Sequence, residues 1–322
     1  MSSRLETHMV MSQRQRRVTV GVRLVVVAFA LFFALFPVIW VAKAAFDPYG
    51  SLASRTIIPE GVESPGELFQ NFTTLLTDPD HLDRYPFWNW LVNSIFVATV
   101  STVLTVLITA LSAYSFSRFR FTGRRLTLLG VLLIQVFPNL LGMVALFLIL
   151  REIGRLPERI PEVFPFLAGI DWSWLNLFAL NSLGGLILVY MAGAMGVNTW
   201  LMKGYFDSIP HDIDESAMVD GATHWQTFWR LIFPLVRPIL AVVGVLAFVG
   251  TFNEFVLARV LLRSKENWTL MVGLYNFITN NFARDWGKFA AGALVAATPI
   301  VIVYLLLQDQ IVGGLTAGSV KG

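Results

Sequence analysis

Hydrophobic residues are concentrated in six long runs of this chain, and polar segments separate the runs. The runs cover residues 20–41, 93–116, 126–150, 180–202, 239–260 and 289–307. A helix needs roughly 20 predominantly apolar residues to cross the hydrocarbon core of a bilayer, and each run is close to that length. The pattern therefore predicts an all-α, polytopic membrane protein with six transmembrane helices, and we interpret residues 1–322 as one transmembrane domain.

The second run differs from the others because hydroxyl side chains interrupt it: Ser94, Ser101, Thr102, Thr105, Thr109 and Ser112. Small and hydroxyl-bearing residues favour close helix–helix contact, so we expect this helix inside the bundle rather than against lipid. Pro138 in the third run and Pro299 in the sixth predict kinks, which are tolerated where neighbouring helices or water satisfy the freed carbonyls.

Basic residues near the ends of the runs predict the orientation of the chain. Four arginines precede or begin the first run (Arg14, Arg16, Arg17 and Arg23), and four follow the second (Arg118, Arg120, Arg124 and Arg125). Lysine and arginine are enriched in cytoplasmic loops, so an N-terminal tail of about residues 1–17 is expected in the cytoplasm. Alternation then places residues 210–238 and both termini there, and residues 43–91 and 151–180 outside. The expected location is the inner or plasma membrane.

The polar segment between the fourth and fifth runs has the pattern of a helical hairpin. Asp212, followed by Glu215 three residues later, resembles an acidic capping box and predicts the start of a short helix. Gly221 predicts the end of that helix, because glycine adopts the left-handed conformation common there. Thr223 and Gln226 form a second capping box. The second helix is expected to share one apolar face among Trp225, Phe228, Trp229 and Ile232. Two prolines then disfavour direct continuation into the next run: Pro234 and Pro238.

Composition supports a membrane protein and excludes several kinds of chemistry. Hydrophobic residues make up 56% of the chain and charged residues only 14%, whereas roughly a quarter of a soluble protein is charged. A net charge of +3 is too small to indicate nucleic-acid binding. The absence of cysteine excludes disulfides and thiolate metal sites. The four histidines lack metal-ligand spacing, and no phosphate-binding loop or catalytic motif occurs. We therefore expect no catalytic residue, metal or cofactor in this chain.

Ionisable residues are scarce within the runs, and Glu254, near the outer end of the fifth run, is the main exception. A transporter driven by protons or sodium usually keeps ionisable groups at membrane depth. Their scarcity argues against a secondary transporter and indicates that a partner supplies the energy.

The EAA motif of membrane subunits in ATP-binding-cassette (ABC) importers closely resembles residues 215–238, which read ESAMVDGATHWQTFWRLIFPLVRP. The matching positions are Glu215, Ala217, Asp220, Gly221, Ala222, Phe228, Pro234 and Pro238. The motif differs conservatively at Ser216, Leu231 and Phe233. The C-terminal sequence GLTAGSVKG and the segments FPNLLGMVALF (137–147), KGYF (203–206) and DGATHWQTF (220–228) are similar to MalG-like permease subunits of maltose and maltodextrin ABC importers. This resemblance covers nearly the whole chain from the first run onward and implies the MetI-like bundle of a type I ABC importer.

The resemblance implies three contact sites, none of them catalytic. A coupling hairpin of about residues 210–238 would dock on an ATPase through Glu215, Ser216, Ala217, Asp220, Gly221, Ala222, Phe228 and Pro234. A tail, residues 313–322, would reach between two ATPase subunits through Gly314, Leu315, Thr316, Ala317, Gly318, Ser319, Val320, Lys321 and Gly322. The outer segment 262–287 would touch a sugar-binding protein through Tyr275, Asn276, Phe277, Thr279, Asn280 and Asn281. A merely connecting loop is the alternative for this last segment.

The function implied by the resemblance is that of a permease subunit that forms half of the pathway for maltose or maltodextrin. Its expected partners are a MalF-like second permease, a homodimer of MalK-like ATPases that binds ATP-Mg, an extracytoplasmic sugar-binding protein, the sugar itself and the lipid bilayer. Trehalose or another oligosaccharide is the alternative cargo. A secondary transporter and a membrane-embedded scaffold protein are the alternative classes.

Overall fold

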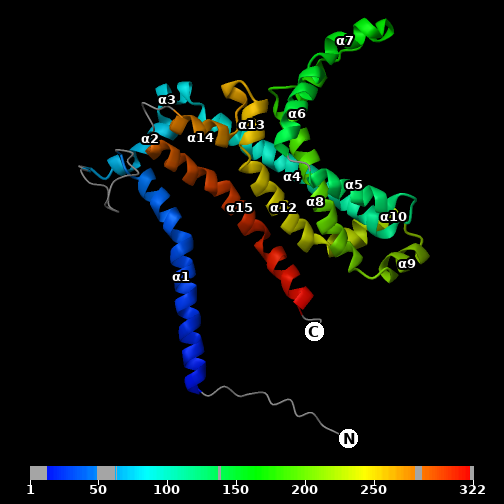
Figure 1. Cartoon of the computed structure of the whole chain (residues 1–322), viewed down its shortest axis with the longest axis horizontal. Coiled ribbons are helices and arrows are strands. Elements are labelled where there is room, and N and C mark those ends of the chain that lie inside the picture. Colours follow the sequence, from blue (N-terminus) through cyan, green and yellow to red (C-terminus); the bar gives the residue numbers. More distant parts are fainter. Residues whose placement is uncertain (1–12, 49–61, 63, 137–138, 280–284, 320–322) are drawn as a thin grey trace.

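A computed structural model describes residues 13–48, 62, 64–136, 139–279 and 285–319, and every regular element in these ranges is helical (Figure 1). The longer helices are α1 (Gln13–Ala45), α4 (Phe87–Arg118), α5 (Arg124–Val136), α6 (Asn139–Ile153), α8 (Leu183–Asp207), α12 (Arg237–Phe252), α14 (Leu270–Thr279) and α15 (Trp286–Ser319). The shorter α-helices are α2 (Gln70–Thr77), α3 (Pro79–Arg84), α7 (Leu156–Val163), α9 (Asp212–Val219), α10 (His224–Thr227), α11 (Phe233–Leu235) and α13 (Val256–Leu261). The short 3-10 helices are η1 (Glu67–Phe69), η2 (Pro165–Leu167), η3 (Ser173–Phe178) and η5 (Lys265–Asn267), and η4 (Phe228–Ile232) is a short π-helix.

Four of the six predicted spans are single helices within the described ranges, namely α1, α4, α8 and α15. The predicted kink at Pro299 does not interrupt α15, which runs through the proline. The third predicted span, residues 126–150, is instead two helices, because α5 and α6 are inclined to each other by 104°. Pro138, where a kink was expected, lies outside the described residues.

The fifth predicted span, residues 239–260, is also not one helix. α12 ends at Phe252, and α13 begins only at Val256. The Asn253 side chain turns back to donate to the carbonyl of Val249 at 2.9 Å. Glu254 then accepts from the first backbone N–H groups of α13, so a side-chain carboxylate starts the new helix.

The prediction that the second span lies in the interior is confirmed. α4 packs against both α8 and α12. Four of its hydroxyl residues, Ser94, Ser101, Thr105 and Thr109, are almost fully buried. By contrast, none of the residues in the most apolar stretch of α1 is buried within this chain. In Figure 1, α1 meets α15 near one end and diverges from it toward the other.

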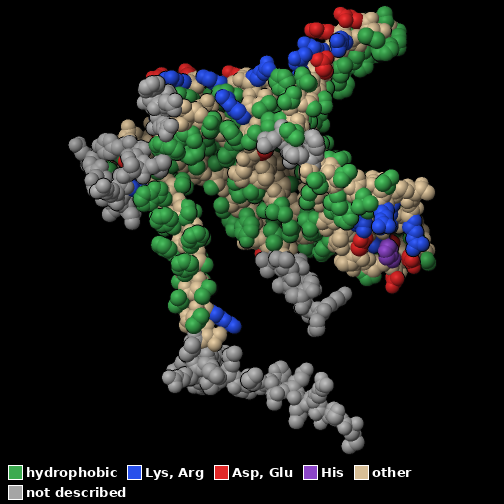
Figure 2. Space-filling model, in the orientation of Figure 1, with side chains coloured by type: hydrophobic (Ala, Val, Ile, Leu, Met, Phe, Trp, Pro, Cys, Tyr) green, Lys and Arg blue, Asp and Glu red, His purple; other side chains and the backbone are tan. Residues whose placement is uncertain are grey.

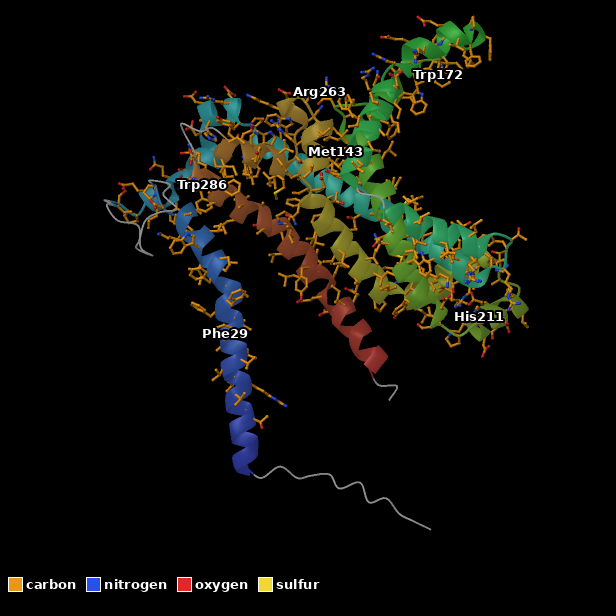
Figure 3. The ribbon with its side chains drawn as sticks, viewed as in Figure 1. Phe29, Met143, Trp172, His211, Arg263 and Trp286 are labelled. Atoms are coloured by element: carbon orange, nitrogen blue, oxygen red, sulfur yellow. The ribbon has the colours of Figure 1, made fainter. Side chains whose placement is uncertain are left out.

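The segments predicted to lie on the same side of the membrane are grouped together in the fold. At one end, the Asn71 side chain donates to the carbonyls of Ala45 at 3.1 Å and Asp47 at 2.8 Å, which joins α2 to the end of α1. Figure 3 places Arg263 and Trp286 near this end and His211 at the opposite end. Figure 2 shows charged side chains gathered at these two zones, with hydrophobic surface between them.

Candidate functional site

The polar segment after α8 folds into the predicted hairpin of short helices. α9 ends where Gly221 adopts the left-handed conformation, with φ of +80°. The Gly221 N–H donates to the carbonyl of Met218 at 3.0 Å, and the Ala222 N–H donates to that of Ala217 at 2.9 Å. This pair of bonds is the Schellman pattern, which satisfies carbonyls that a helix end leaves free. Glycine at this position is therefore explained by backbone geometry.

One of the two predicted capping boxes forms. Thr223 Oγ1 accepts from the Gln226 backbone N–H at 3.3 Å, and Gln226 Oε1 accepts from the Thr223 N–H at 2.8 Å. The box predicted from Asp212 and Glu215 is wrong, because α9 begins one residue earlier, with His211 as the N-cap and no side-chain capping bond. Asp212 instead lies in the first turn, where a carboxylate is favoured by the positive end of the helix dipole.

The second half of the hairpin is held by aromatic packing. α10 continues into a π-helical turn, η4, and then α11, and this helical segment meets α12 at an angle of 77°. Phe228 and Ile232 are 1% and 0% exposed, and the Phe228 ring lies 5.1 Å from that of Tyr114 on α4. Trp225, predicted to share the buried face, is 61% exposed because it lies in the first turn, at the rim of this cluster.

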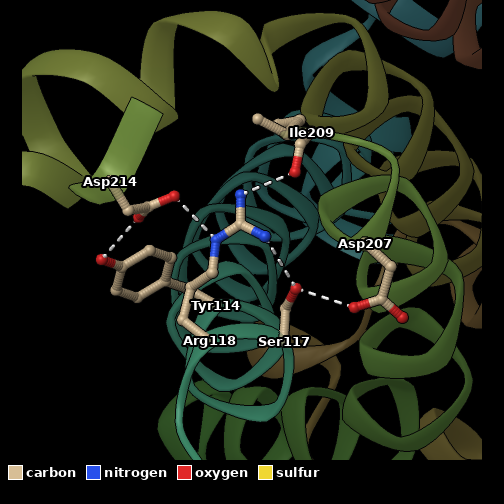
Figure 4. A network of polar contacts seen from close by, with 6 residues as sticks. All are labelled: Tyr114, Ser117, Arg118, Asp207, Ile209 and Asp214. Atoms are coloured by element: carbon tan, nitrogen blue, oxygen red, sulfur yellow. Dashed lines mark hydrogen bonds and ion pairs between the residues drawn. The ribbon is translucent and has the colours of Figure 1, made fainter. Parts of the chain in front are cut away.

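A polar network, buried at Arg118 and Asp214 but exposed at Asp207, ties the hairpin to the ends of two long helices (Figure 4). Arg118, the last residue of α4, pairs with Asp214 of α9, with Nε and Oδ2 2.9 Å apart and both side chains no more than 7% exposed. The Arg118 guanidinium also donates to the carbonyl of Ile209 at 3.1 Å, and the Tyr114 hydroxyl donates to Asp214 at 3.2 Å. The Ser117 hydroxyl donates to Asp207, the last residue of α8, at 2.7 Å.

The outer face of the hairpin combines acidic and apolar side chains. Glu215, Ser216 and Asp220 are exposed. Beside them, Met218 is 42% exposed and Val219 is 88% exposed. Exposed apolar residues rimmed by charge are typical of protein–protein contact surfaces. This face can therefore receive a protein partner, while the opposite face is fixed to α4 and α8.

The residues predicted for ATPase coupling divide into two groups. The structure brings Glu215, Ser216, Asp220, Gly221 and Pro234 to the surface, Ala222 is half-buried, and Ala217 and Phe228 are buried among side chains that hold the hairpin. Sequence reasoning missed Asp214 and used Arg118 only as an indicator of orientation. The pattern that could have found Asp214 is its spacing of three from Ala217, which puts a charge on the inward face of a short helix and so requires a buried partner.

Within the predicted outer contact segment, residues 262–287, the structure forms helix α14 at Leu270–Thr279. Phe277 of α14 is 4% exposed and packs against Tyr85 and Trp90, so it is part of the core and not of a tip. Asn276 donates to the carbonyl of Val272 at 2.9 Å. Tyr275 is 39% exposed, Thr279 is exposed, and Asn280 and Asn281 lie outside the described residues.

The backbone of the predicted tail continues α15 as far as Ser319, and residues 320–322 lie outside the described part. The helix therefore includes Gly314, Leu315, Thr316, Ala317, Gly318 and Ser319. Within the described ranges, no group of three or more His, Asp or Glu side chains is placed to hold a metal ion.

The fold is that of a polytopic helical membrane protein that holds an exposed, partly apolar hairpin at one end of its bundle. Residues 105–313 match the family described as the inner membrane component of binding-protein-dependent transport systems, and the chain belongs to this family. It is 36% identical over 295 residues to the galactooligosaccharides transport system permease protein GanQ of Bacillus subtilis (strain 168), a match that covers 92% of this chain and 93% of GanQ. It is also 36% identical over 301 residues to the maltose/maltodextrin transport system permease protein MalG of Escherichia coli (strain K12), covering 91% and 93%.

A solved structure supports the same fold. A chain of a bacterial ABC transporter involved in the import of the acidic polysaccharide alginate matches with a TM-score of 0.70 and 23% identity, over 93% of this chain and 98% of that one. The predicted fold class, a MetI-like permease bundle of an ABC importer, is thereby confirmed.

Proposed function

We propose that this chain is a permease subunit of an ATP-driven oligosaccharide importer and that residues 210–238 couple it to an ATPase. The observation that carries the proposal is that one face of the hairpin is exposed while the other is fixed to the bundle. Its outer face is exposed, with Val219 88% exposed, while Asp214 is joined to Arg118 in the interior. A partner that moves this surface would therefore move α4 with it.

The proposed complex contains one further permease of the MalF type, two MalK-like ATPases that bind ATP-Mg, and a sugar-binding protein outside the membrane. Both termini and the hairpin lie on the cytoplasmic side in this arrangement. The grouping of the hairpin with the arginine-rich residues 118–125 supports it, because Arg118 contacts Asp214 directly and such basic segments favour the cytoplasm. The tail, residues 313–322, is proposed to contact the ATPases, and α14 with its flanking residues the binding protein.

In mechanistic terms, ATP-driven closure of the ATPase pair would shift the hairpin, and the bundle would rock between inward-open and outward-open states. Such alternating access is a rigid-body change between two packed arrangements. The ATPases would drive this chain from one state to the other only if they bind the hairpin with a different free energy in each state.

Maltose or maltodextrin is the favoured cargo, since several maltose and maltodextrin permeases match nearly the whole chain. A galactooligosaccharide is the second candidate, because GanQ matches equally well over a similar length. The test is uptake by vesicles that contain the whole complex and its binding protein, with maltotriose, trehalose and a short galactooligosaccharide as probes. We expect maltotriose uptake that requires ATP. Uptake driven by a proton or sodium gradient without ATP would refute the proposal, as would no uptake of any of the three sugars.

A further inference from the structure

An open groove of about 810 Å³ lies between the two broken spans, and the coupling role leaves it unexplained. α5 and α6 form one side, α8 another, and the junction of α12 and α13 the third. Most of its lining is aliphatic or glycine, as at Leu133, Leu146 and Gly193. Small-molecule sites in proteins have this size range and this mostly apolar lining with a few fixed polar groups.

The fixed polar groups of the groove are Glu254 and Tyr190. The Tyr190 hydroxyl, on α8, donates a hydrogen bond to Glu254 Oε2. The same carboxylate accepts from the backbone N–H groups of Leu257 at 2.8 Å and Ala258 at 3.0 Å. An ionisable side chain within a membrane span is costly and usually serves a function. Capping α13 alone needs no ionised group, because Ser, Thr or Asn side chains cap helices as well.

The chemistry of the groove selects for a neutral, hydroxyl-rich ligand. A carboxylate offers about four acceptor sites, and three donors already occupy the Glu254 oxygens, which leaves about one site for an incoming hydroxyl. The Tyr190 oxygen donates to Glu254 and keeps lone pairs that can accept from a hydroxyl. Aliphatic walls suit the C–H faces of a sugar ring. A cation is disfavoured, because Glu254 is the one acidic residue among the described residues that line the groove, and its three donors already stabilise it.

We propose that this groove is a sugar-contact subsite of the translocation pathway, with Glu254 and Tyr190 hydrogen-bonding the sugar hydroxyls. The inference rests on the proposed function and extends it, because it gives this subunit a direct contact with the cargo. Thr251, which also lines the groove, adds a hydroxyl on the α12 side. The alternative occupant is a side chain of the second permease, and the experiment below separates the two.

The experiment uses the complete complex in vesicles with its binding protein and maltotriose as the probe. Sugar uptake and ATP hydrolysis are measured together for Tyr190→Phe and Glu254→Gln, with Tyr205→Phe on the same helix as the matched control. A hydrogen bond to a charged group accounts for a factor of about ten or more in affinity. We expect the apparent KM for transported maltotriose to rise about tenfold and the sugar moved per ATP to fall, whereas Tyr205→Phe leaves both values unchanged.

Two results overturn the inference. If uptake and hydrolysis fall in the same proportion, Glu254 and Tyr190 only hold α13 against α8. If neither value changes, the groove receives the second permease and not the sugar. Tyr190→Phe keeps the ring and the α13 cap, so it decides the question even if Glu254→Gln fails to assemble. A wild-type complex that transports none of the probe sugars refutes the proposed function itself, and this is seen before any variant is compared.

Discussion

Arg118 ends α4 with its guanidinium buried, and it contacts Asp214 of α9 and the carbonyl of Ile209, two residues after the end of α8. Removing one partner of a buried ion pair leaves an uncompensated charge, while replacing both by apolar residues is often neutral. The pair therefore positions the hairpin, and we expect the loss of one member to destabilise the protein more than the loss of both.

We expect Arg118→Met and Asp214→Leu each to destabilise the protein by about 3–5 kcal/mol and to reduce the ATPase retained on purification. The double variant is expected to recover most of this loss. Lys203→Met is the control, because its partner Asp207 has a side chain that is 43% exposed, and such pairs contribute about 0–1 kcal/mol. The measurement is the thermal unfolding midpoint of the purified complex. A double variant as unstable as either single one would contradict the argument.

Substitutions at Gly221 test the effect of backbone conformation without the effect of a steric clash. A Cβ at this position would meet no atom within 4 Å, so only the φ of +80° opposes substitution. Gly221→Val is expected to uncouple transport, because a left-handed conformation costs a non-glycine residue about 1–2 kcal/mol and a β-branched residue more. Gly221→Asn should be milder, since asparagine tolerates this conformation.

Gly204→Val is the matched control for Gly221→Val, because Gly204 has equally open surroundings but ordinary helical backbone in α8. Membrane insertion, co-purification of the ATPase and sugar uptake are measured for all three variants. Normal uptake by Gly221→Val would show that this turn is not needed for coupling.

Among the elements, the two broken spans show the limit of what hydropathy predicts. Average hydropathy over 239–260 indicates one apolar segment. It cannot predict that the Asn253 side chain donates to the Val249 carbonyl, or that the Glu254 carboxylate accepts from the first turn of a new helix. The capping box at Thr223 and the turn at Gly221 were predicted correctly, because their determinants lie within a few residues of sequence. The same local reasoning was wrong for the capping box at Asp212 and Glu215. Local patterns therefore predict some turns and caps, whereas hydropathy does not predict an interruption by one or two polar side chains inside an apolar run.

A deletion in the tail, residues 313–322, tests whether this end of α15 contributes to coupling with the ATPases. α15 continues to Ser319, beyond residues 289–307, the apolar run that the sequence predicts to span the membrane. Deleting 316–322 is expected to leave the bundle assembled, because the removed residues lie beyond this apolar run. It should lower the stimulation of ATP hydrolysis by sugar-loaded binding protein. Hydrolysis rates in a reconstituted complex, with and without loaded binding protein, provide the measurement. An unchanged stimulation would mean that the tail has no role in coupling.

Over the whole molecule, the sequence predicts the helical class and the grouping of loops at two ends, since both follow from hydropathy and charge. The burial of particular site residues depends on tertiary neighbours and could not be predicted. Phe277 is buried because Tyr85 and Trp90, far away in sequence, pack against it. Asp214 is buried because Arg118 lies at the end of another helix. In both cases a long-range contact decides whether a side chain faces a partner or the core.

The position of α1 has a consequence for how the protein is made. None of the residues in its most apolar stretch is buried within this chain. The long helix that α1 contacts is α15, which is far from it in sequence. α1 is synthesised well before α15, the helix that it contacts. Until α15 has been made, α1 lacks this contact, which leaves time for an insertase or a neighbouring subunit to bind it. A chain that ends before Trp286 would leave α1 permanently without this contact.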